Sequence, residues 1–200
     1  MLIEFIHHLI LIPGTLLFVL LLCGGSFAQE FKAPPASTPV KIEADSLAYD
    51  QARDVYSAEG NVVITYGDGV VKAASVEFDR KSNLAVAQGG AFLKMAEDTL
   101  AGDKITVNVE DKTGVAFQSK AFYARNHFFI RGDKIEKTGE NTYSIDQPVA
   151  TTCDGENPDW QIAGSKMKVT VEGYGWVTHA RLAVKGVPIF YTPFIALPAK

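Results

Sequence analysis

Cysteine and histidine can act as metal ligands, nucleophiles or general bases, and both are rare in this sequence. The cysteines are Cys23 and Cys153, and after residue 28 the histidines are His127 and His179, 52 positions apart. Protein zinc sites draw their cysteine and histidine ligands from closely spaced pairs. The spacing therefore predicts no metal site, and no motif in the sequence indicates a cofactor.

Carboxylates are numerous, but their arrangement does not indicate catalysis. They are spread over outward positions of the predicted strands, which is typical of a solvated face. No G-x-S-x-G elbow, no P-loop and no G-x-G-x-x-G opening a helix occurs. The sequence therefore predicts a protein that is not an enzyme. A glycosidase, which needs two carboxylates across a cleft, is the enzymatic alternative that the pattern leaves open.

Composition places the chain among globular proteins without a nucleic-acid face. Of its 200 residues 47% are hydrophobic and 21% are charged, which disfavours disorder. The formal net charge is −4, and the 19 basic residues form no cluster. Nucleic-acid binding needs clustered positive charge, so no such partner is expected.

The N-terminal segment has the pattern of an export signal. Leu9–Leu22 is an apolar run of 14 residues interrupted by Pro13-Gly14-Thr15, shorter than the roughly 20 residues that span a bilayer. Small residues follow at Ser26 and Ala28, so we expect a signal peptide over residues 1–28, cleaved after Ala28. An uncleaved membrane anchor and lipid attachment at Cys23 are the alternatives. Leu22, directly before Cys23, disfavours lipid attachment.

The rest of the chain divides into a linker, a β-rich domain and an apolar end. Residues 29–40 contain three prolines and are expected to form a flexible linker. Apolar and polar residues then alternate over residues 41–183, as in strands with one dry face. Turn sequences separate these strands at Tyr66–Gly69, Asp111–Gly114 and Lys137–Asn141. The pattern predicts an all-β fold, a sandwich or a barrel.

A weak internal repeat runs through the β-rich domain. Five similar segments start 29, 28, 30 and 32 residues apart, and each is expected to open a strand. The repeating unit is then a strand pair, stacked about five times, with neighbours that build a continuous apolar interior. The five segments are Ala44–Leu47, Ala73–Val76, Ala101–Ile105, Arg131–Ile135 and Ala163–Met167.

The alternating apolar residues predict an inner face for this domain. Residue types alone do not decide between a closed sandwich core and a lipid-binding groove, since both are apolar faces of sheets. Each buried methylene of an acyl chain would contribute about 0.8 kcal/mol, so a groove needs no special residues. The predicted inner-face residues are Val62, Ile64, Tyr66, Val76, Phe78, Leu84, Val86, Ile105, Val107, Val109, Val115 and Phe117.

Within these repeats the sequence resembles the OstA-like family of periplasmic lipopolysaccharide-transport domains, the LptA/LptC/LptD superfamily. The matching segments are Ile42–Asp50, Ala58–Val62 (A-E-G-N-V) and Ala73–Asp79. The resemblance implies a β-jellyroll of stacked antiparallel strand pairs, open at its ends. It also implies that the inner-face residues bind the acyl chains of lipopolysaccharide.

The C-terminal quarter resembles the LptD branch of this superfamily. The matching residues are Thr151-Thr152-Cys153, Pro158-Asp159-Trp160 and Gly186–Phe194. This resemblance implies transfer of lipopolysaccharide to an outer-membrane barrel, at the periplasmic face of the outer membrane. We therefore expect the chain to be a fragment without its barrel. A stand-alone bridge like LptA and a structural β-repeat protein with a closed core are the alternatives.

The resemblance also implies partners. Exposed terminal strands suit edge pairing with an LptA-like bridge, and the outer-membrane lipoprotein LptE would join if the barrel is present. By its position Cys153 resembles the cysteine that forms a disulfide to the barrel part. Residues 184–200 contain Pro188, Pro193 and Pro198, which cannot donate to a sheet ladder. We expect this stretch to be an edge strand or an apolar connection leading towards the barrel.

Overall fold

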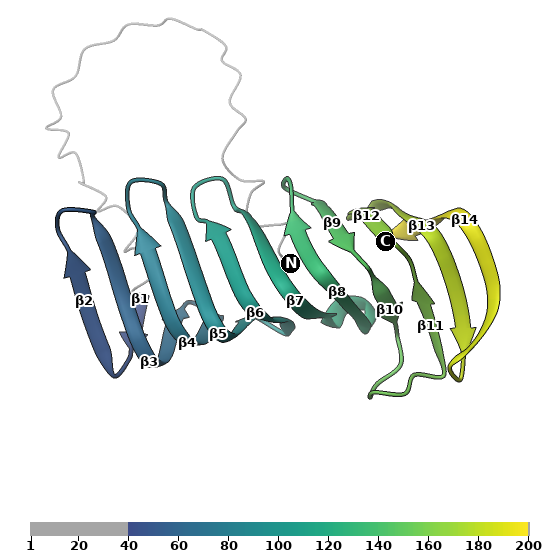
Figure 1. Ribbon diagram of the computed structural model, residues 1–200, viewed down its shortest axis with the longest axis horizontal. Helices are drawn as coiled ribbons and strands as arrows, with labels where there is room; N and C mark the ends of the chain where they lie inside the picture. The colour runs from purple at the N-terminus through teal and green to yellow at the C-terminus, as the bar shows by residue number, and fades with distance from the viewer. Residues whose placement is uncertain (1–39, 200) are drawn as a thin grey trace, which may run out of the picture. The chain divides into compact units, whose positions relative to one another are not determined.

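The computed structural model describes residues 40–199, and about three quarters of them belong to β-strands (Figure 1). The predicted signal peptide and residues 29–39 of the predicted linker lie outside the described residues. The all-β prediction is confirmed. The strands are β1 (Val40–Glu43), β2 (Ser46–Asp50), β3 (Val55–Tyr66), β4 (Gly69–Asp79), β5 (Leu84–Met95), β6 (Asp98–Asn108), β7 (Thr113–Tyr123), β8 (Phe128–Lys137), β9 (Thr142–Asp146), β10 (Val149–Thr151), β11 (Trp160–Ala163), β12 (Lys166–Thr170), β13 (Gly173–Val184) and β14 (Val187–Ala199).

Helical structure in the described range is limited to a single 3₁₀ turn, η2 (Ala124–Asn126). Over residues 40–199 we find no helix with the length and apolar character needed to cross a bilayer. The predicted turns at Tyr66–Gly69, Asp111–Gly114 and Lys137–Asn141 lie between successive strands, as expected.

All fourteen strands form one antiparallel sheet. Three pairs of short strands are the halves of longer, bent strands. β1 and β2 both pair with β3, β9 and β10 both pair with β8, and β11 and β12 both pair with β13. The sheet is therefore an up-and-down meander of long strands.

A line of irregular backbone crosses the middle of these strands, and we call it the fold line. On alternate strands it carries residues with positive φ: Gly60 (75°), Gly89 (78°), Gln118 (46°), Gln147 (49°) and His179 (50°). Register shifts accompany it between β3 and β4, β4 and β5, and β5 and β6. Bulges of this kind bend a strand and raise its twist, so the whole sheet bends along one line.

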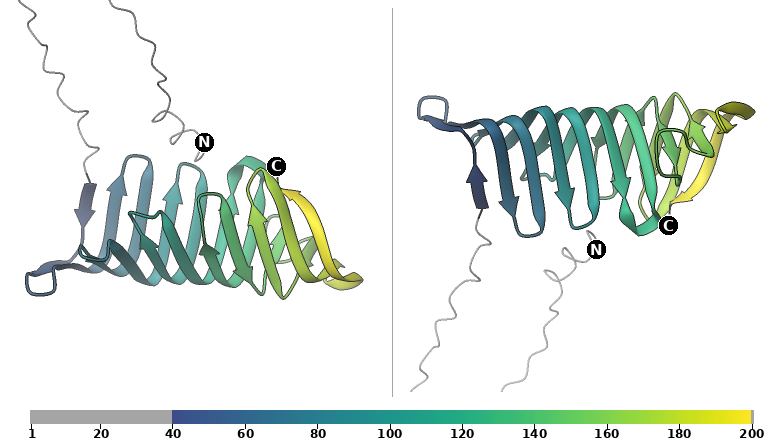
Figure 2. Two further views of the ribbon diagram at one scale, coloured as in Figure 1. Left: turned by 90° about the horizontal axis from the view of Figure 1, so that it is seen from above. Right: turned by 90° about the horizontal axis from the view of Figure 1, so that it is seen from below.

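The two halves of the sheet fold towards each other about this line. We name them the β1 half and the β2 half, after the first strand segment on each side. In Figure 2, β1 and the β2–β3 hairpin, in purple and dark blue, leave the fold line in clearly different directions. One apolar cluster contains Val62 and Ala91 of the β1 half together with Ala58 and Ile105 of the β2 half, so the inner faces of the halves pack on each other.

The repeated segments mark the fold line. Ala44–Leu47 and Ala163–Met167 contain the first residues of β2 and β12, as predicted, but the other three segments do not open strands, so for these three the prediction is wrong. Ala73–Val76, Ala101–Ile105 and Arg131–Ile135 lie in the middle of β4, β6 and β8. Their small residues reflect close approach of backbone. A Cβ added at Gly132 would lie 2.6 Å from Ile145 Cγ2 and 2.9 Å from the Asp146 carbonyl oxygen. The predicted spacing of about 30 residues between segments is correct, because the chain crosses the fold line once in each direction in every two-strand unit.

Two apolar clusters fill the interior beside the fold line. The first cluster runs from β3 to β7, and the second extends from the β8 region to β14. Between them Ser119, only 2% exposed, donates from its hydroxyl to the carbonyl oxygens of Ala116 (3.3 Å) and Gly132 (3.5 Å). The buried apolar residues of the two clusters are Ala58, Val62, Ala73, Val76, Ala87, Ala91, Ile105, Ala116, Ile145, Ala150, Met167, Val177 and Ala180.

Candidate functional site

The inner face of the folded sheet carries both clusters of buried apolar residues. Eight of the twelve predicted inner-face residues share the strand face that carries the buried clusters, or, for Val109, continue its alternation. Val62, Val76 and Ile105 are buried at the fold line, and Ile64 and Val107 pack against the first cluster. Tyr66, Phe78 and Val109 lie farther from the fold line, and Val109 is in the turn after β6. Val115 belongs to the outer-face group that follows.

Leu84, Val86, Val115 and Phe117 lie on the outer face, so the structure does not bring them together with the others. The turn after β4 sets the register so that Leu84 pairs with Asp79 and Val86 pairs with Glu77. Val86 and Val115 are both opposite Thr106 of β6. In β7 the side chain of Ala116 is buried on the inner face. Its large neighbours Val115 and Phe117 therefore point outward. The inner face therefore holds eight of the predicted residues.

Exposure on the inner face increases from the fold line to the margins of the sheet. Along β3, Val62 is 1% exposed and Tyr66 is 55% exposed, and along β5 the value rises from 1% at Ala91 to 43% at Met95. Near the fold line the halves are in contact. Near the margins apolar side chains of the inner face remain accessible.

Sequence reasoning missed much of this surface. The alanines at the fold line were overlooked because alternation was sought among large residues. The whole second half of the inner face was overlooked too, although the repeat spacing would have located it. These inner-face residues include Ile130, Ile135, Tyr143, Ile145, Ile162, Met167, Val169, Val177 and Ile195.

Tyr143 is an ionisable residue at the margin of the inner face. Burial raises the pKa of the Tyr143 phenol, and the nearby Tyr123 and Asp98 of the other half add to that shift. Asp98 also accepts a hydrogen bond from the Ala124 backbone N–H (2.9 Å). No buried side-chain nitrogen or oxygen of the described residues lacks a partner. The interior therefore offers a ligand apolar contact and few polar anchors.

The histidines lie apart, each with its own partner. His127 Nε2 is 3.1 Å from Asp154 Oδ1, and His179 Nδ1 is 2.8 Å from the Tyr191 hydroxyl. Among residues 40–199 no group of three potential metal ligands comes together. We find no arrangement in this range that resembles a catalytic centre.

Cys153 is a free, half-buried thiol in the segment 152–159, which joins β10 to β11. The Thr151 hydroxyl fixes the start of this segment, because it accepts from the Cys153 backbone N–H (3.1 Å) and donates to the Trp160 carbonyl oxygen (2.6 Å). The pair of His127 and Asp154 attaches the next residue to the turn before β8. The structure therefore places the thiol on an irregular segment held at both ends.

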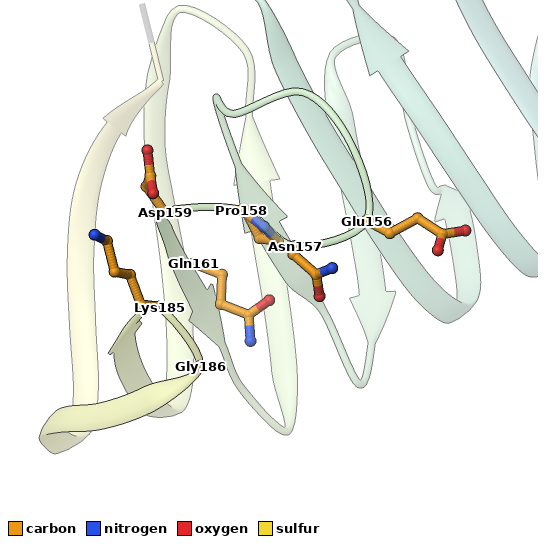
Figure 3. Close-up of a pocket in the computed structure, with 7 residues that line it drawn as sticks. All are labelled: Glu156, Asn157, Pro158, Asp159, Gln161, Lys185 and Gly186. Carbon is orange, nitrogen blue, oxygen red and sulfur yellow. The ribbon is translucent and has the colours of Figure 1, made fainter.

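A polar pocket of about 390 Å³ adjoins the same segment (Figure 3). One wall is the stretch Glu156–Asp159 with Gln161, and the other is the turn of Lys185 and Gly186 between β13 and β14. The Lys185 backbone N–H donates to the Asp159 carbonyl oxygen (2.9 Å), which joins the two walls. The pocket is lined by both acidic and basic residues, so it does not suit an acyl chain. The sequence had not indicated this pocket.

The single folded sheet, its repeating strand pairs and its apolar inner face define an all-β protein of the repeat class. Residues 41–174 match the family described as "LptA/(LptD N-terminal domain) LPS transport protein". The chain belongs to this family.

Individual relatives agree with that assignment. The chain is 33% identical to the LPS-assembly protein LptD of Aliivibrio fischeri over 80% of its own length and 20% of that protein. It is 30% identical to the LptD of Acinetobacter baumannii over 80% of its length and 22% of that protein. The chain thus spans about a fifth of these relatives. A solved structure of LptH, the LptA-homologous periplasmic component from Pseudomonas aeruginosa, is 23% identical, with a TM-score of 0.43, and the match covers 50% of this chain and 75% of that one.

Proposed function

We propose that this chain binds lipopolysaccharide by its acyl chains along the inner face and passes it towards an outer-membrane β-barrel. The observation that carries the proposal is the gradient of exposure on the inner face. A closed sandwich would bury its apolar side chains up to the margins, whereas Tyr66 and Met95 stay 55% and 43% exposed. Membership of the lipopolysaccharide-transport family supports the identity of the ligand.

The fold line limits where acyl chains can lie. Ala58, Ala73, Ala91 and other small residues already pack there. Acyl chains therefore lie nearer the margins, against half-buried residues such as Ile64 and Val107. Burial of each methylene contributes about 0.8 kcal/mol, so several chains together hold the lipid without a polar anchor.

Photo-crosslinking tests this proposal. A photoreactive amino acid at Ile64 or Val107 should capture lipopolysaccharide in cells, because both positions face the interior. The matched controls are Glu77 and Asn108, which lie on the outer face of β4 and β6. Equal capture at all four positions would contradict the proposal. Purification without detergent and with no lipid retained would favour a structural protein with a closed core.

The terminal strands support a proposal about partners. β1 and β2 form one end of the sheet and β14 the other, and each end has a ladder edge without a partner strand in the described range. Apolar residues are exposed at both ends, among them Ile42 (45%) and Phe194 (68%). We infer that the β1–β2 end pairs edge to edge with an LptA-like bridge in the periplasm. The β14 end then faces the barrel, with which LptE would associate.

Cys153 carries a finer proposal about the full-length protein. We infer that it forms a disulfide with a cysteine beyond Lys200, because an exported thiol meets oxidising conditions. The segment 152–159 is held in place by its hydrogen bonds, which favours a fixed geometry for the bond. Full-length protein and its Cys153→Ser variant should differ in mobility on a non-reducing gel. Equal mobility, with a thiol in the wild type that still reacts with an alkylating reagent, would show a purely structural cysteine.

A further inference from the structure

The outer surface of the β1 half carries an extended row of positive charge. Residues directly opposite one another form a continuous line across the strands from β4 to β14: Lys72, Phe92, Ala101, Lys120, Arg131, Val149, Ala163, Arg181 and Tyr191. Lys94 lies in the next line towards the margin. We call Lys72, Lys94, Lys120, Arg131 and Arg181 the basic row, and all five side chains belong to exposed residues.

The basic row is not neutralised within the described part of the chain. None of its five cations makes an ion pair there. Lys120 lies directly opposite Arg131, and like charges in such a cross-strand pair destabilise a sheet. The outer surface of the β2 half differs, since there Lys134 pairs with Glu136 (2.6 Å) and Lys166 with Asp146 (3.6 Å).

Acidic residues lie at the borders of this face. Within the β1 half, the outer face of strands β1 to β13 carries one acidic residue, Glu43. Its carboxylate forms an ion pair with Lys41 (2.6 Å). Asp103 and Asp133 lie on the fold line, and Asp154 lies in the segment 152–159, where it pairs with His127. The row thus forms a strip of one sign with acids beside it, on a chain whose net charge is −4.

The length of the row indicates the size of its partner. Lys72 and Arg181 are seven strand steps apart, which corresponds to roughly 35 Å at the usual strand spacing. A small anion cannot neutralise charges over such a distance, but a continuous anionic surface can. The row ends in apolar residues that suit a lipid interface. Arg181 borders a shallow hollow of about 290 Å³ with Pro188, Ile189, Phe190 and Tyr191.

We propose that the basic row docks the outer surface of the β1 half onto an anionic phospholipid bilayer. The lysines and arginines contact headgroup phosphates, and the exposed side chain of Tyr191, which lies opposite Arg181 on the same face, enters the interface. This inference rests on the proposed function, which brings the chain close to a membrane. It assigns to the outer face a second lipid contact, separate from the acyl-chain path on the inner face.

Vesicle flotation tests the proposal. The chain should float with vesicles of phosphatidylcholine and phosphatidylglycerol in equal parts, more than with phosphatidylcholine alone. The variant Lys72→Gln/Lys120→Gln/Arg131→Gln should lose about fivefold in apparent affinity for each cation removed. Added salt should weaken binding of the unsubstituted chain, because exposed charges are screened within about 10 Å at 0.1 M ionic strength.

The matched control removes three positive charges from the other half. Lys104→Gln/Lys166→Gln/Lys168→Gln lies on the outer surface of the β2 half and should bind nearly as well as the unsubstituted chain. Equal losses in the two variants would overturn the proposal, as would binding that does not depend on phosphatidylglycerol. Circular dichroism of each variant confirms that the sheet is intact.

A crosslinker at Ile64 separates this inference from the proposed function. If the basic row serves only the bilayer, capture of lipopolysaccharide at Ile64 by purified protein persists in the Lys72/Lys120/Arg131 variant. Loss of capture in this variant, with vesicle binding unchanged, would show that the row serves lipopolysaccharide capture and would overturn its role in docking to a bilayer. Absence of vesicle binding with capture intact would refute the docking proposal alone.

Discussion

The fold line and the margins of the same sheet follow opposite rules of packing. At the fold line the inner face is built from alanine, glycine and a few β-branched residues, and Val62 is 1% exposed. At the margins the inner face carries larger side chains that remain partly in water, as Tyr66 and Met95 do. One sheet therefore contains a dry core along one line and accessible apolar side chains farther from it. The difference shows that burial on the inner face is set by distance from the fold line.

The largest effect should follow from adding a methyl group at the fold line. In Gly132→Ala the new Cβ would lie 2.6 Å from Ile145 Cγ2 and 2.9 Å from a backbone oxygen. Neither group can move freely, so we expect a loss of about 3 kcal/mol in the free energy of unfolding, measured by urea denaturation. Gly139→Ala is the control, because its Cβ would meet only Thr142 Cβ at 4.0 Å. Similar stability of the two variants would show that the halves do not approach closely at this line.

A smaller effect should distinguish the two faces at adjacent residues. Val62→Ala removes two methyl groups from the first cluster and should cost about 2 kcal/mol. Val63→Ala removes the same groups from the outer face and should cost less than about 0.5 kcal/mol. The comparison uses urea denaturation of both variants. Equal losses would mean that β3 has a different register from the one described.

The smallest effect concerns the margin at high pH. Because the folded state raises the pKa of Tyr143, folding favours the protonated phenol. This contribution is fully present below the ordinary tyrosine pKa of about 10 and is lost as the pH rises through the raised value. Tyr143→Phe should therefore lose less stability than the wild type between about pH 9 and about pH 11. A parallel decline of thermal stability in both proteins would show that Tyr143 ionises as freely when folded as when unfolded.

Sequence patterns predicted the strands, the hairpin turns and the period of the repeat. These features depend on local properties: alternation within one strand, and Gly, Asp and Asn where positive φ is needed. The Tyr66–Gly69 turn is an example, since β3 ends at Tyr66 and β4 begins at Gly69. The edge-strand alternative for the proline-containing end is also correct, because β14 pairs with β13 alone.

Which face of the sheet a side chain occupies after a turn could not be predicted from local patterns. A shift of one residue in the register moves a whole strand to the other face. Leu84 follows a turn that places it opposite Asp79, so its alternation continues from the polar side of β4. The segment Arg131–Ile135 was likewise assigned to a strand opening because small and polar residues are common in turns. Its glycine serves the approach of Ile145 from the neighbouring strand, a tertiary cause that local patterns do not contain.

Pairing only between chain neighbours makes the length of this protein an adjustable quantity. Each unit of two strands contacts the unit before it and the unit after it, so stability is close to a sum of unit and interface terms. Insertion of one further unit of 29 residues, the interval between Gly60 and Gly89, would leave every other pairing unchanged. It would lengthen the sheet by two strand spacings, about 10 Å. Duplication of a short stretch of the gene would therefore change the span of the domain in fixed steps.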